Sequence, residues 1–331
     1  MIDTIDFYYP YTNGIVTDKY FSVILDAFHK LGIEYNKIES FDRKRSSNIL
    51  VAAVQDATRA KKAGYKRVFL WIQGIIPEES FLRNHSKLRR VILSFLENKG
   101  LKNADFVFYV SNAMREHFKT KYRYDNEHYY IMPCFNDELH KEAYFAAGKY
   151  RNNVFLYAGS LDAWQCFSET VNLYAKIEQK VENCSFRILT KDGETAKKII
   201  EEKGIRNYSI GFVPANQIGT EMEKAKFGFS IRKDDPVNRV ATPTKLSTYI
   251  AYGVMPIYSN CLQGFDETAR DNPFCICIDR DENSISRLID MCYTENDAGK
   301  IYLQMEKTFG KYYSSSYHIE QIVEVLQKWL L

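Results

Sequence analysis

Two cations and the start of a helix lie close together in the second half of the chain and could bind an anion. Arg232 follows an apolar run, 227–231, that is expected to form a buried strand, and Lys245 lies in the first turn of an expected helix. That helix should open with Thr242 as its N-cap and Pro243 at its first position. Helix N-termini attract anions, and open α/β sheets bind ligands at the carboxyl ends of strands. The pattern indicates a diphosphate site; the alternative is an ordinary strand–helix unit with a solvated basic loop.

Alternating apolar runs and helical periodicity predict parallel α/β architecture along the whole chain. Strands are expected at 5–9, 67–72, 106–110, 129–132, 154–157, 186–190, 208–211, 227–231, 254–258 and 274–278. Helices are expected at 18–31, 47–63, 79–98, 112–121, 168–181, 194–202, 218–224, 244–251, 285–293 and 319–331. The polar stretch 147–153 is typical of a linker between two Rossmann-like halves.

The length of the chain favours two domains, because 331 residues exceed the usual size of one hydrophobic core. The rest of the composition is typical of a cytoplasmic enzyme. The sequence has no apolar run of about 18 residues and no signal-peptide pattern at its start. Its seven cysteines form no CxxC pair, which indicates reduced thiols and no zinc site. A net charge of +3 gives no reason to expect nucleic acid as a partner. Neither a Walker loop nor a G-x-G-x-x-G motif is present, which argues against ATPases and NAD dehydrogenases.

The segment PTKLSTYIAYGVMPIYS resembles the donor-binding region of GT-B glycosyltransferases of family 4. Pro243, Lys245, Ala251 and Gly253 fall at the matching places, and Pro256 is displaced by one residue. The order of the other segments is also similar to that family: ADFVFYVSNAMREHF and YYIMPCF, then VFLYAGSL, FRILTKDG and YSIGFVPANQIGTEMEKAKFGFSI. The resemblance covers nearly the whole chain and depends on the order of these segments.

The resemblance implies two Rossmann-like domains that face each other across a cleft. Residues 1–147 would form the acceptor domain, 148–316 the nucleotide-sugar donor domain, and 317–331 a helix that packs back on the first domain. The implied activity is metal-independent transfer, with retained configuration, from a UDP or GDP sugar to a glycan or lipid-linked glycan. No separate cofactor is implied. The implied location is the cytoplasm, with peripheral contact at the inner face of the membrane as a further expectation.

The resemblance also assigns the site residues. Arg232 and Lys245 would stabilise the charge that develops on the leaving diphosphate, together with N–H groups near the start of the helix. The remaining donor-side residues would be Gly159, Ser160, Thr190, Lys191, Gly211, Phe212, Val213, Thr242, Pro243, Thr244 and Thr248. The acceptor-side residues would be Gly14, Gln73 and Gly74. No metal ligands are assigned, and Asp234–Asp235 is more typical of a solvated acidic loop.

The chain departs from the family pattern at two places. Many relatives carry two glutamates eight positions apart, and here those places hold Val240 and Thr248, whose hydroxyl is a weaker ribose ligand than a carboxylate. The lysine usual after the glycine loop is replaced by Trp164 or Gln165, and Arg239 is a candidate substitute in space. These losses leave open an inactive GT-B binding or regulatory subunit, and, as a third hypothesis, a sugar-nucleotide epimerase.

One predicted helix has a sequence pattern that suits contact with a lipid surface. Residues 81–96 are basic and amphipathic, with Arg83, Lys87, Arg89 and Arg90 among them. Such a helix could rest on anionic lipid. The sequence favours the alternative, a solvated helix that turns its apolar side into the domain core.

Overall fold

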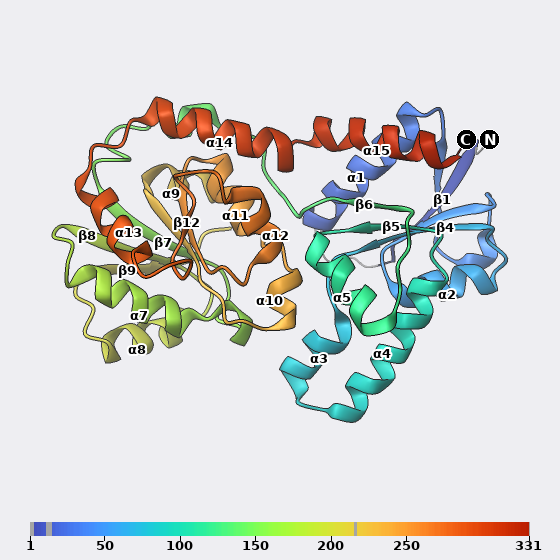
Figure 1. The fold of residues 1–331 in the computed structure, drawn as a ribbon, viewed down its shortest axis with the longest axis horizontal. Coiled ribbons are helices and arrows are strands. Elements are labelled where there is room, and N and C mark those ends of the chain that lie inside the picture. Colours follow the sequence, from blue (N-terminus) through green and yellow to red (C-terminus); the bar gives the residue numbers. More distant parts are fainter. Residues whose placement is uncertain (1–2, 11–14, 215–216, 331) are drawn as a thin grey trace. The chain divides into compact units, whose positions relative to one another are not determined.

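The computed structural model describes residues 3–10, 15–214 and 217–330, which alternate between strands and helices (Figure 1). They divide into two compact units. Unit 1 consists of Met1–Cys134, Arg239–Thr242 and Tyr312–Leu331, and unit 2 of Phe135–Asn238 and Pro243–Lys311. The stretch expected as a linker, 147–153, lies in unit 2, where Lys149 and Tyr150 are buried.

Unit 1 contains a parallel sheet of six strands in the order β2-β1-β3-β4-β5-β6. Its strands are β1 (Thr4–Tyr8), β2 (Glu34–Lys37), β3 (Asn48–Val51), β4 (Arg67–Ile72), β5 (Phe106–Tyr109) and β6 (Tyr129–Ile131). Its helices are α1 (Ile15–Lys30), η1 (Phe41–Arg43), α2 (Val54–Lys62), α3 (Ile76–Asn84), α4 (Lys87–Lys102), α5 (Asn112–Tyr122) and α15 (Ser315–Leu330). Helices α1 and α15 lie on one face of this sheet, and α2, α4 and α5 lie on the other (Figure 1).

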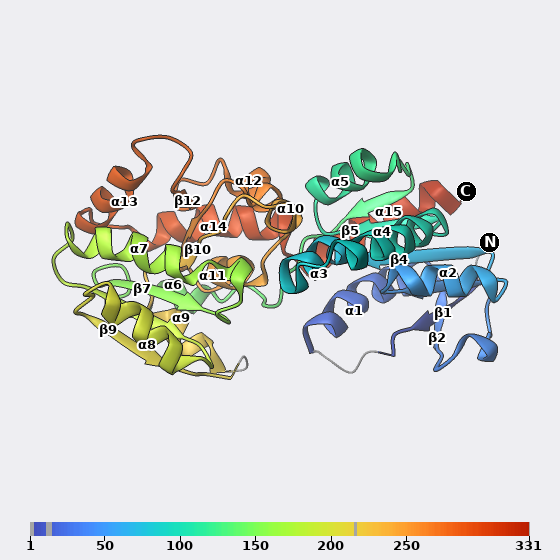
Figure 2. The same ribbon diagram turned by 90° about the horizontal axis from the view of Figure 1, so that it is seen from below.

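Unit 2 contains the second parallel sheet, in the order β12-β11-β10-β7-β8-β9. Its strands are β7 (Asn153–Ala158), β8 (Cys184–Leu189), β9 (Tyr208–Gly211), β10 (Phe227–Ser230), β11 (Met255–Tyr258) and β12 (Ile276–Cys277). Its helices are α6 (Lys141–Tyr144), η2 (Ala163–Gln165), α7 (Phe167–Glu178), α8 (Gly193–Glu202), α9 (Gly219–Lys224), α11 (Thr244–Ala251), α12 (Gln263–Ala269), α13 (Ser284–Tyr293) and α14 (Ala298–Tyr312). Between the units in sequence runs α10 (Pro236–Val240). Figure 2 looks onto the face of the sheet of unit 1, with α2 and α4 in front of its strands.

The order of strands in unit 2 is that of a Rossmann fold, read from β9 to β12. The chain moves from β7 outward to β9, then returns to pair β10 with the other edge of β7. This reversal creates a switch point between β7 and β10, where open α/β sheets hold their ligands. Phe155 on β7 stacks on Phe227 of β10, with ring centroids 4.8 Å apart, so the two strands also share a packed aromatic core.

The final helix belongs to unit 1, as the resemblance implies. Ile322 and Leu326 of α15 are fully buried, and α15 packs against α1. The Trp329 ring lies 5.3 Å from that of Phe69 and 5.4 Å from that of Phe106, on adjacent strands of the sheet. The end of the chain therefore completes the core that the first strands begin.

The structure corrects three predictions about the elements of unit 1. The expected helix 47–63 is strand β3 followed by α2, because all four residues of β3 are buried and its apolar run has no helical period. The expected helix 79–98 is two helices, because His85 takes a left-handed conformation with φ 52° and Ser86 caps the second helix. The expectation that this helix turns its apolar side into the core is wrong, since five large apolar side chains of α4 are exposed.

Candidate functional site

Arg232 and Lys245 converge on one atom at the switch point of unit 2. Arg232 lies two residues beyond the end of β10, and Lys245 is the second residue of α11. The Gln165 side-chain oxygen accepts a hydrogen bond from Arg232 Nη2 at 2.6 Å and from Lys245 Nζ at 2.9 Å. Gln165 ends the short helix η2, which follows β7. Two cations of the stretch from β10 to α11 are thus held by a single neutral acceptor from the segment after β7.

Burial sets the electrostatics of this pair. Arg232 is 7% exposed and Lys245 is half-buried, and burial lowers the pKa of both. The pKa of Lys245 is held well below its usual value by burial first and then by the nearby charge of Arg232. In the part of the chain that the structure describes, neither cation has a carboxylate within ion-pair distance. An anion placed here would replace the water that burial has removed and offset the repulsion between the cations.

The surrounding residues shape a small space around Lys245. Its Nζ lies 4.7 Å from the centre of the Tyr157 ring, close enough for a cation–π contact. Gly159 follows β7 with φ +151°, and a Cβ there would lie 3.1 Å from Lys245 Nζ. Glycine therefore allows the backbone after β7 to come close to the cation. The adjacent Ser160 is exposed and donates a hydrogen bond to Asp162 at 2.6 Å.

The start of α11 differs from the prediction. The helix begins at Thr244, and Pro243 occupies the N-cap position without a side-chain cap hydrogen bond. Thr242 was expected as the cap, but it belongs to unit 1, where its hydroxyl accepts the Cys134 N–H at 3.0 Å. Proline cannot cap by a side chain, so the first N–H groups of α11 keep no side-chain acceptor from it.

Five other predicted donor-side residues meet at the carboxyl ends of β8 and β9. Thr190 donates its backbone N–H to the carbonyl of Gly211 at 2.9 Å. One residue further on, Lys191 Nζ lies 5.4 Å from the centre of the Phe212 ring, which is 55% exposed. Val213 follows and is half-buried. Because β10, β7, β8 and β9 are neighbours in that order, these residues lie along the same sheet edge as the Arg232–Lys245 pair.

Thr248 is not available as a free hydroxyl. It is buried, and its hydroxyl donates to the Asp137 carboxylate at 2.6 Å. Asp137 lies in the segment before α6 and is not among the predicted site residues. The structure therefore brings a carboxylate to the helix position where the family pattern has a glutamate.

The acceptor-side predictions fall in unit 1. Gln73 and Gly74 follow β4, and Gln73 is exposed. A Cβ on Gly74 would lie 2.0 Å from the Glu79 carboxylate, which accepts the N–H of Ile75 at 3.1 Å. A larger residue at position 74 would therefore displace the Glu79 side chain from this hydrogen bond. Gly14 lies outside the described residues, and Arg239 belongs to unit 1.

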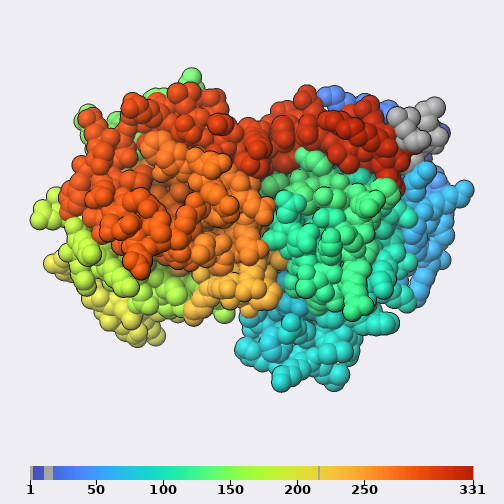
Figure 3. Space-filling view, in the orientation of Figure 1, coloured from blue at the N-terminus to red at the C-terminus, as the bar shows by residue number. Residues whose placement is uncertain are grey.

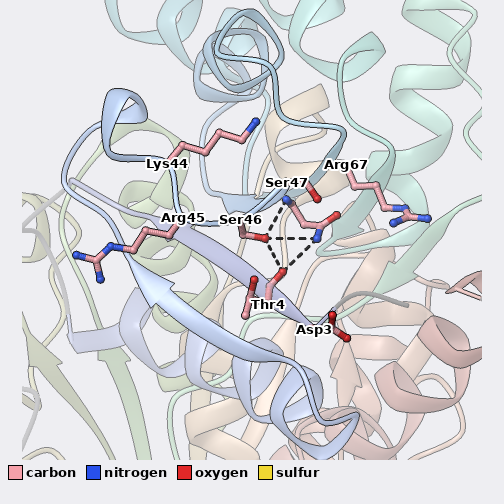
Figure 4. A pocket seen from close by; sticks show the side chains of 8 residues that line it. Asp3, Thr4, Lys44, Arg45, Ser46, Ser47 and Arg67 are labelled. Atoms are coloured by element: carbon pink, nitrogen blue, oxygen red, sulfur yellow. Dashed lines mark hydrogen bonds between the residues drawn. The ribbon is translucent and has the colours of Figure 1, made fainter.

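The cavity drawn in Figure 4 lies elsewhere in unit 1 and has a volume of about 470 Å³. Thr4, Asn48 and Arg67 line it at the amino ends of their strands, the opposite edge from a ligand site in this architecture. Ser46 and Asn48 both donate to the carbonyl of Thr4, at 2.6 and 3.1 Å. We therefore place the candidate site at the β7–β10 switch point.

The described residues offer neither a metal site nor a membrane span. They include no group of three or more His, Cys, Asp or Glu side chains arranged to hold a metal ion. None of their helices is long and apolar enough to span a bilayer. All seven cysteines are free, and six of them are buried.

Comparison with solved structures gives the same architecture over the whole chain. The chain is similar to HepE of Anabaena, solved with UDP and glucose, at 13% identity and a TM-score of 0.66 over 98% of this chain and 99% of that one. It is similar to sucrose-phosphate synthase of Thermosynechococcus elongatus at 11% identity and a TM-score of 0.70, with 99% of each chain covered. TarM of S. aureus, whose structure contains UDP, matches at 12% identity and a TM-score of 0.60 over 87% of this chain and 55% of that one, so this chain spans about half of TarM.

Comparisons of sequence add nothing to this, since no family model and no curated protein matches the chain. The likeness therefore concerns the fold, and it rests on two proteins that are matched over 98–99% of this chain and 99% of their own. With one parallel six-stranded sheet in each unit and a final helix that returns to the first, the chain has the GT-B glycosyltransferase fold.

Proposed function

We propose that this protein is a glycosyltransferase that moves a sugar from a nucleoside-diphosphate sugar to a glycan or lipid-linked glycan. The observation that carries the proposal is the convergence of Arg232 and Lys245 on Gln165 at the switch point of unit 2. Both cations lack a carboxylate partner among the described residues, and a diphosphate supplies the charge that they lack. HepE and TarM, which share the fold, were solved with UDP, so a UDP sugar is the first donor to test.

The chemistry follows from where charge develops. As the bond between the sugar and the diphosphate breaks, the anomeric carbon becomes positive and the leaving oxygen becomes negative. In this proposal Arg232, Lys245 and the first N–H groups of α11 bind that negative charge more tightly in the transition state than in the ground state. We propose that these groups do so without a metal, and that the acceptor hydroxyl attacks from the side on which the diphosphate leaves, so that configuration is retained.

The proposed donor binds along the edge formed by β10, β7, β8 and β9. The diphosphate would contact Lys245, Arg232 and the backbone at Gly159, and the base would lie towards Gly211 and Phe212. The exposed Phe212 ring offers a stacking surface, and Lys191 beside it adds positive charge. The proposal places the enzyme in the cytoplasm, with peripheral contact to an anionic membrane, and involves no nucleic acid.

A thermal-shift panel with UDP, GDP, CMP, ADP and NAD tests donor binding. A nucleotide present at about a hundred times its dissociation constant should add about 2.7 kcal/mol to the free energy of unfolding. A shift with one nucleoside diphosphate supports the proposal and identifies the base. If none of these nucleotides shifts the melting temperature, the chain is better explained as an inactive GT-B binding or regulatory subunit.

Lys245→Ala tests the catalytic assignment. Because one charged donor to the leaving group is removed, kcat/KM should fall by about 10²–10³-fold while the fold is retained. Lys176→Ala is the matched control, since Lys176 is an exposed lysine on α7, away from the switch point. Turnover at the wild-type rate in Lys245→Ala would contradict the role assigned to this residue.

A further inference from the structure

A row of large apolar side chains on α4 points away from unit 1. Leu88, Val91, Ile92, Phe95 and Leu96 are exposed by 73, 66, 52, 67 and 43%. Their spacing, at positions i, i+3, i+4, i+7 and i+8, places them on one side of the helix, which we call the outer face of α4. A contiguous apolar patch of this kind on a soluble domain marks a contact surface. Figures 1 and 3 show the hairpin of α3 and α4 at the surface of unit 1.

The opposite side of α4 is fixed against the unit. A Cβ on Gly100 would lie 2.1 Å from the backbone oxygen of Val54, so α4 and α2 touch through backbone. Glu97 is 1% exposed and accepts hydrogen bonds from Tyr122 at 2.7 Å and Lys121 at 3.3 Å. Turning the helix to bury its apolar row would break these hydrogen bonds and separate the packed backbones. The outer face of α4 therefore remains exposed unless something outside the unit covers it.

The cationic side chains around the outer face of α4 indicate what kind of surface binds there. Lys87, Arg89, Lys99 and Lys102 are all exposed, and within the described residues none of them lies within ion-pair distance of a carboxylate. The one acidic residue of the helix, Glu97, is on the inner side. On a helical wheel Lys99 and Lys102 continue the outer face by one turn, and Arg89 and Lys87 flank it. Long cationic side chains can reach an anionic surface while their apolar stems stay beside the row.

We propose that the outer face of α4 docks onto a lipid bilayer that contains anionic lipids. The helix lies in the plane of the interface, with its apolar row at the boundary of the acyl chains and its cations at the phosphates of the headgroups. An exposed row of aliphatic side chains and Phe95, with cations on both flanks, matches a lipid surface, whose acyl chains are apolar and whose headgroups are anionic. This proposal rests on the proposed function. A membrane contact would favour a lipid-linked glycan as the acceptor of the transferred sugar.

Co-sedimentation with vesicles tests the contact without any nucleotide. The full-length protein should bind vesicles of phosphatidylcholine with about 30% phosphatidylglycerol, and should bind phosphatidylcholine alone at least tenfold more weakly. Sodium chloride at about 0.5 M should weaken the binding, because it screens the cations. Failure of these vesicle experiments would overturn the docking proposal, whereas the nucleotide thermal shift would be unaffected, so the two proposals can fail separately.

Two variants and a matched control separate the apolar and the charged contributions. Val91→Ser/Phe95→Ser should reduce vesicle binding at least tenfold with an unchanged melting temperature, because both side chains are exposed. Lys99→Gln/Lys102→Gln should remove most of the preference for anionic lipid. Leu303→Ser, at a side chain of α14 that is 62% exposed, should leave binding unchanged. An equal loss of vesicle binding in the Leu303 variant would overturn the proposal. So would vesicle binding at the wild-type level in the Val91/Phe95 variant. A stable dimer of the free protein that dissociates in the Val91/Phe95 variant would also overturn it, because the face would then bind a second copy.

Discussion

At the residue scale, the candidate site depends on a neutral side chain between two cations. Gln165 accepts from Arg232 and from Lys245, and each of these hydrogen bonds has a charged donor, the class worth about 1.5–3 kcal/mol. The amide oxygen holds both cations in place without neutralising either. A site of this kind keeps its positive charge for a ligand and still has an ordered geometry.

Gln165→Glu should stabilise the free protein and weaken nucleotide binding. A carboxylate at this position would pair with both cations, which we expect to raise the free energy of unfolding by about 2 kcal/mol and to weaken UDP binding at least tenfold. A melt without ligand and a calorimetric titration with UDP measure the two effects. Gln179→Glu, at an exposed glutamine at the end of α7, is the control. A lower melting temperature or unchanged UDP affinity in Gln165→Glu would contradict this account.

The sequence was enough to select the two cations but not the residue that joins them. Arg232 and Lys245 stand out by charge beside an apolar strand and a helix start. Gln165 stands out in the sequence only as a replacement for a missing lysine. Its hydrogen bonds to both cations form because η2 lies beside the start of α11, and no local pattern predicts that proximity. Asp137 was overlooked altogether. It is 111 residues from Thr248 in sequence, and a single carboxylate in a loop carries no local signal.

At the element scale, prediction succeeded where an apolar run is bounded by polar residues. Strand β4 lies where the sequence predicts it, and β5 within one residue. It failed for β3, because a strand buried on both faces gives a continuous apolar run that a helix can also give. Helix α14 was missed, although Ile301, Met305 and Phe309 repeat every four residues and are buried. The charged and polar residues between these apolar positions make the segment resemble a solvated loop. Only the four-residue repeat of buried side chains marks it as a helix.

His318, near the start of α15, should make the stability of the protein depend on pH. Its ring is buried; Nε2 donates to the carbonyl of Tyr312 at 2.9 Å, and Nδ1 accepts from the hydroxyl of Tyr130 at 2.8 Å. This pattern satisfies both nitrogens of the neutral ring, and burial lowers the pKa of His318 from 6.5 to about 4. The unfolded chain binds the proton more readily, so stability should be full above pH 6.5 and fall by up to about 3 kcal/mol as the pH drops towards 4.

Urea unfolding between pH 4 and 8 measures this effect. His318→Gln, whose amide can also donate and accept, should show a smaller slope than the wild type over the same range. The difference between the two curves isolates His318 from the other groups that titrate in that window. Parallel curves would mean that His318 carries no such linkage.

At the scale of the whole molecule, each unit has its own sheet and its own core. The sequence predicts this division from length and from the repeat of strand and helix. The units are discontinuous in sequence, since Arg239–Thr242 and Tyr312–Leu331 belong with the first strands. Local patterns cannot reveal that discontinuity, because an amphipathic helix such as α15 carries no mark of which core it will enter. Here the partner core is set by the fit of Trp329 between Phe69 and Phe106.

Because α15 belongs to unit 1, a destabilising mutation in α15 should weaken unit 1 and not unit 2. Leu326 is fully buried in unit 1, so Leu326→Ala should cost about 2–5 kcal/mol. Hydrogen exchange should then quicken in β4 and β5, more than 200 residues earlier, and stay unchanged in β7 and β8. Leu288→Ala is the matched control, because Leu288 on α13 is fully buried in unit 2 and should quicken β7 and β8 only. Equal acceleration of both sheets in both variants would mean that the two cores unfold as one, and that the final helix stabilises the whole molecule and not the first unit alone.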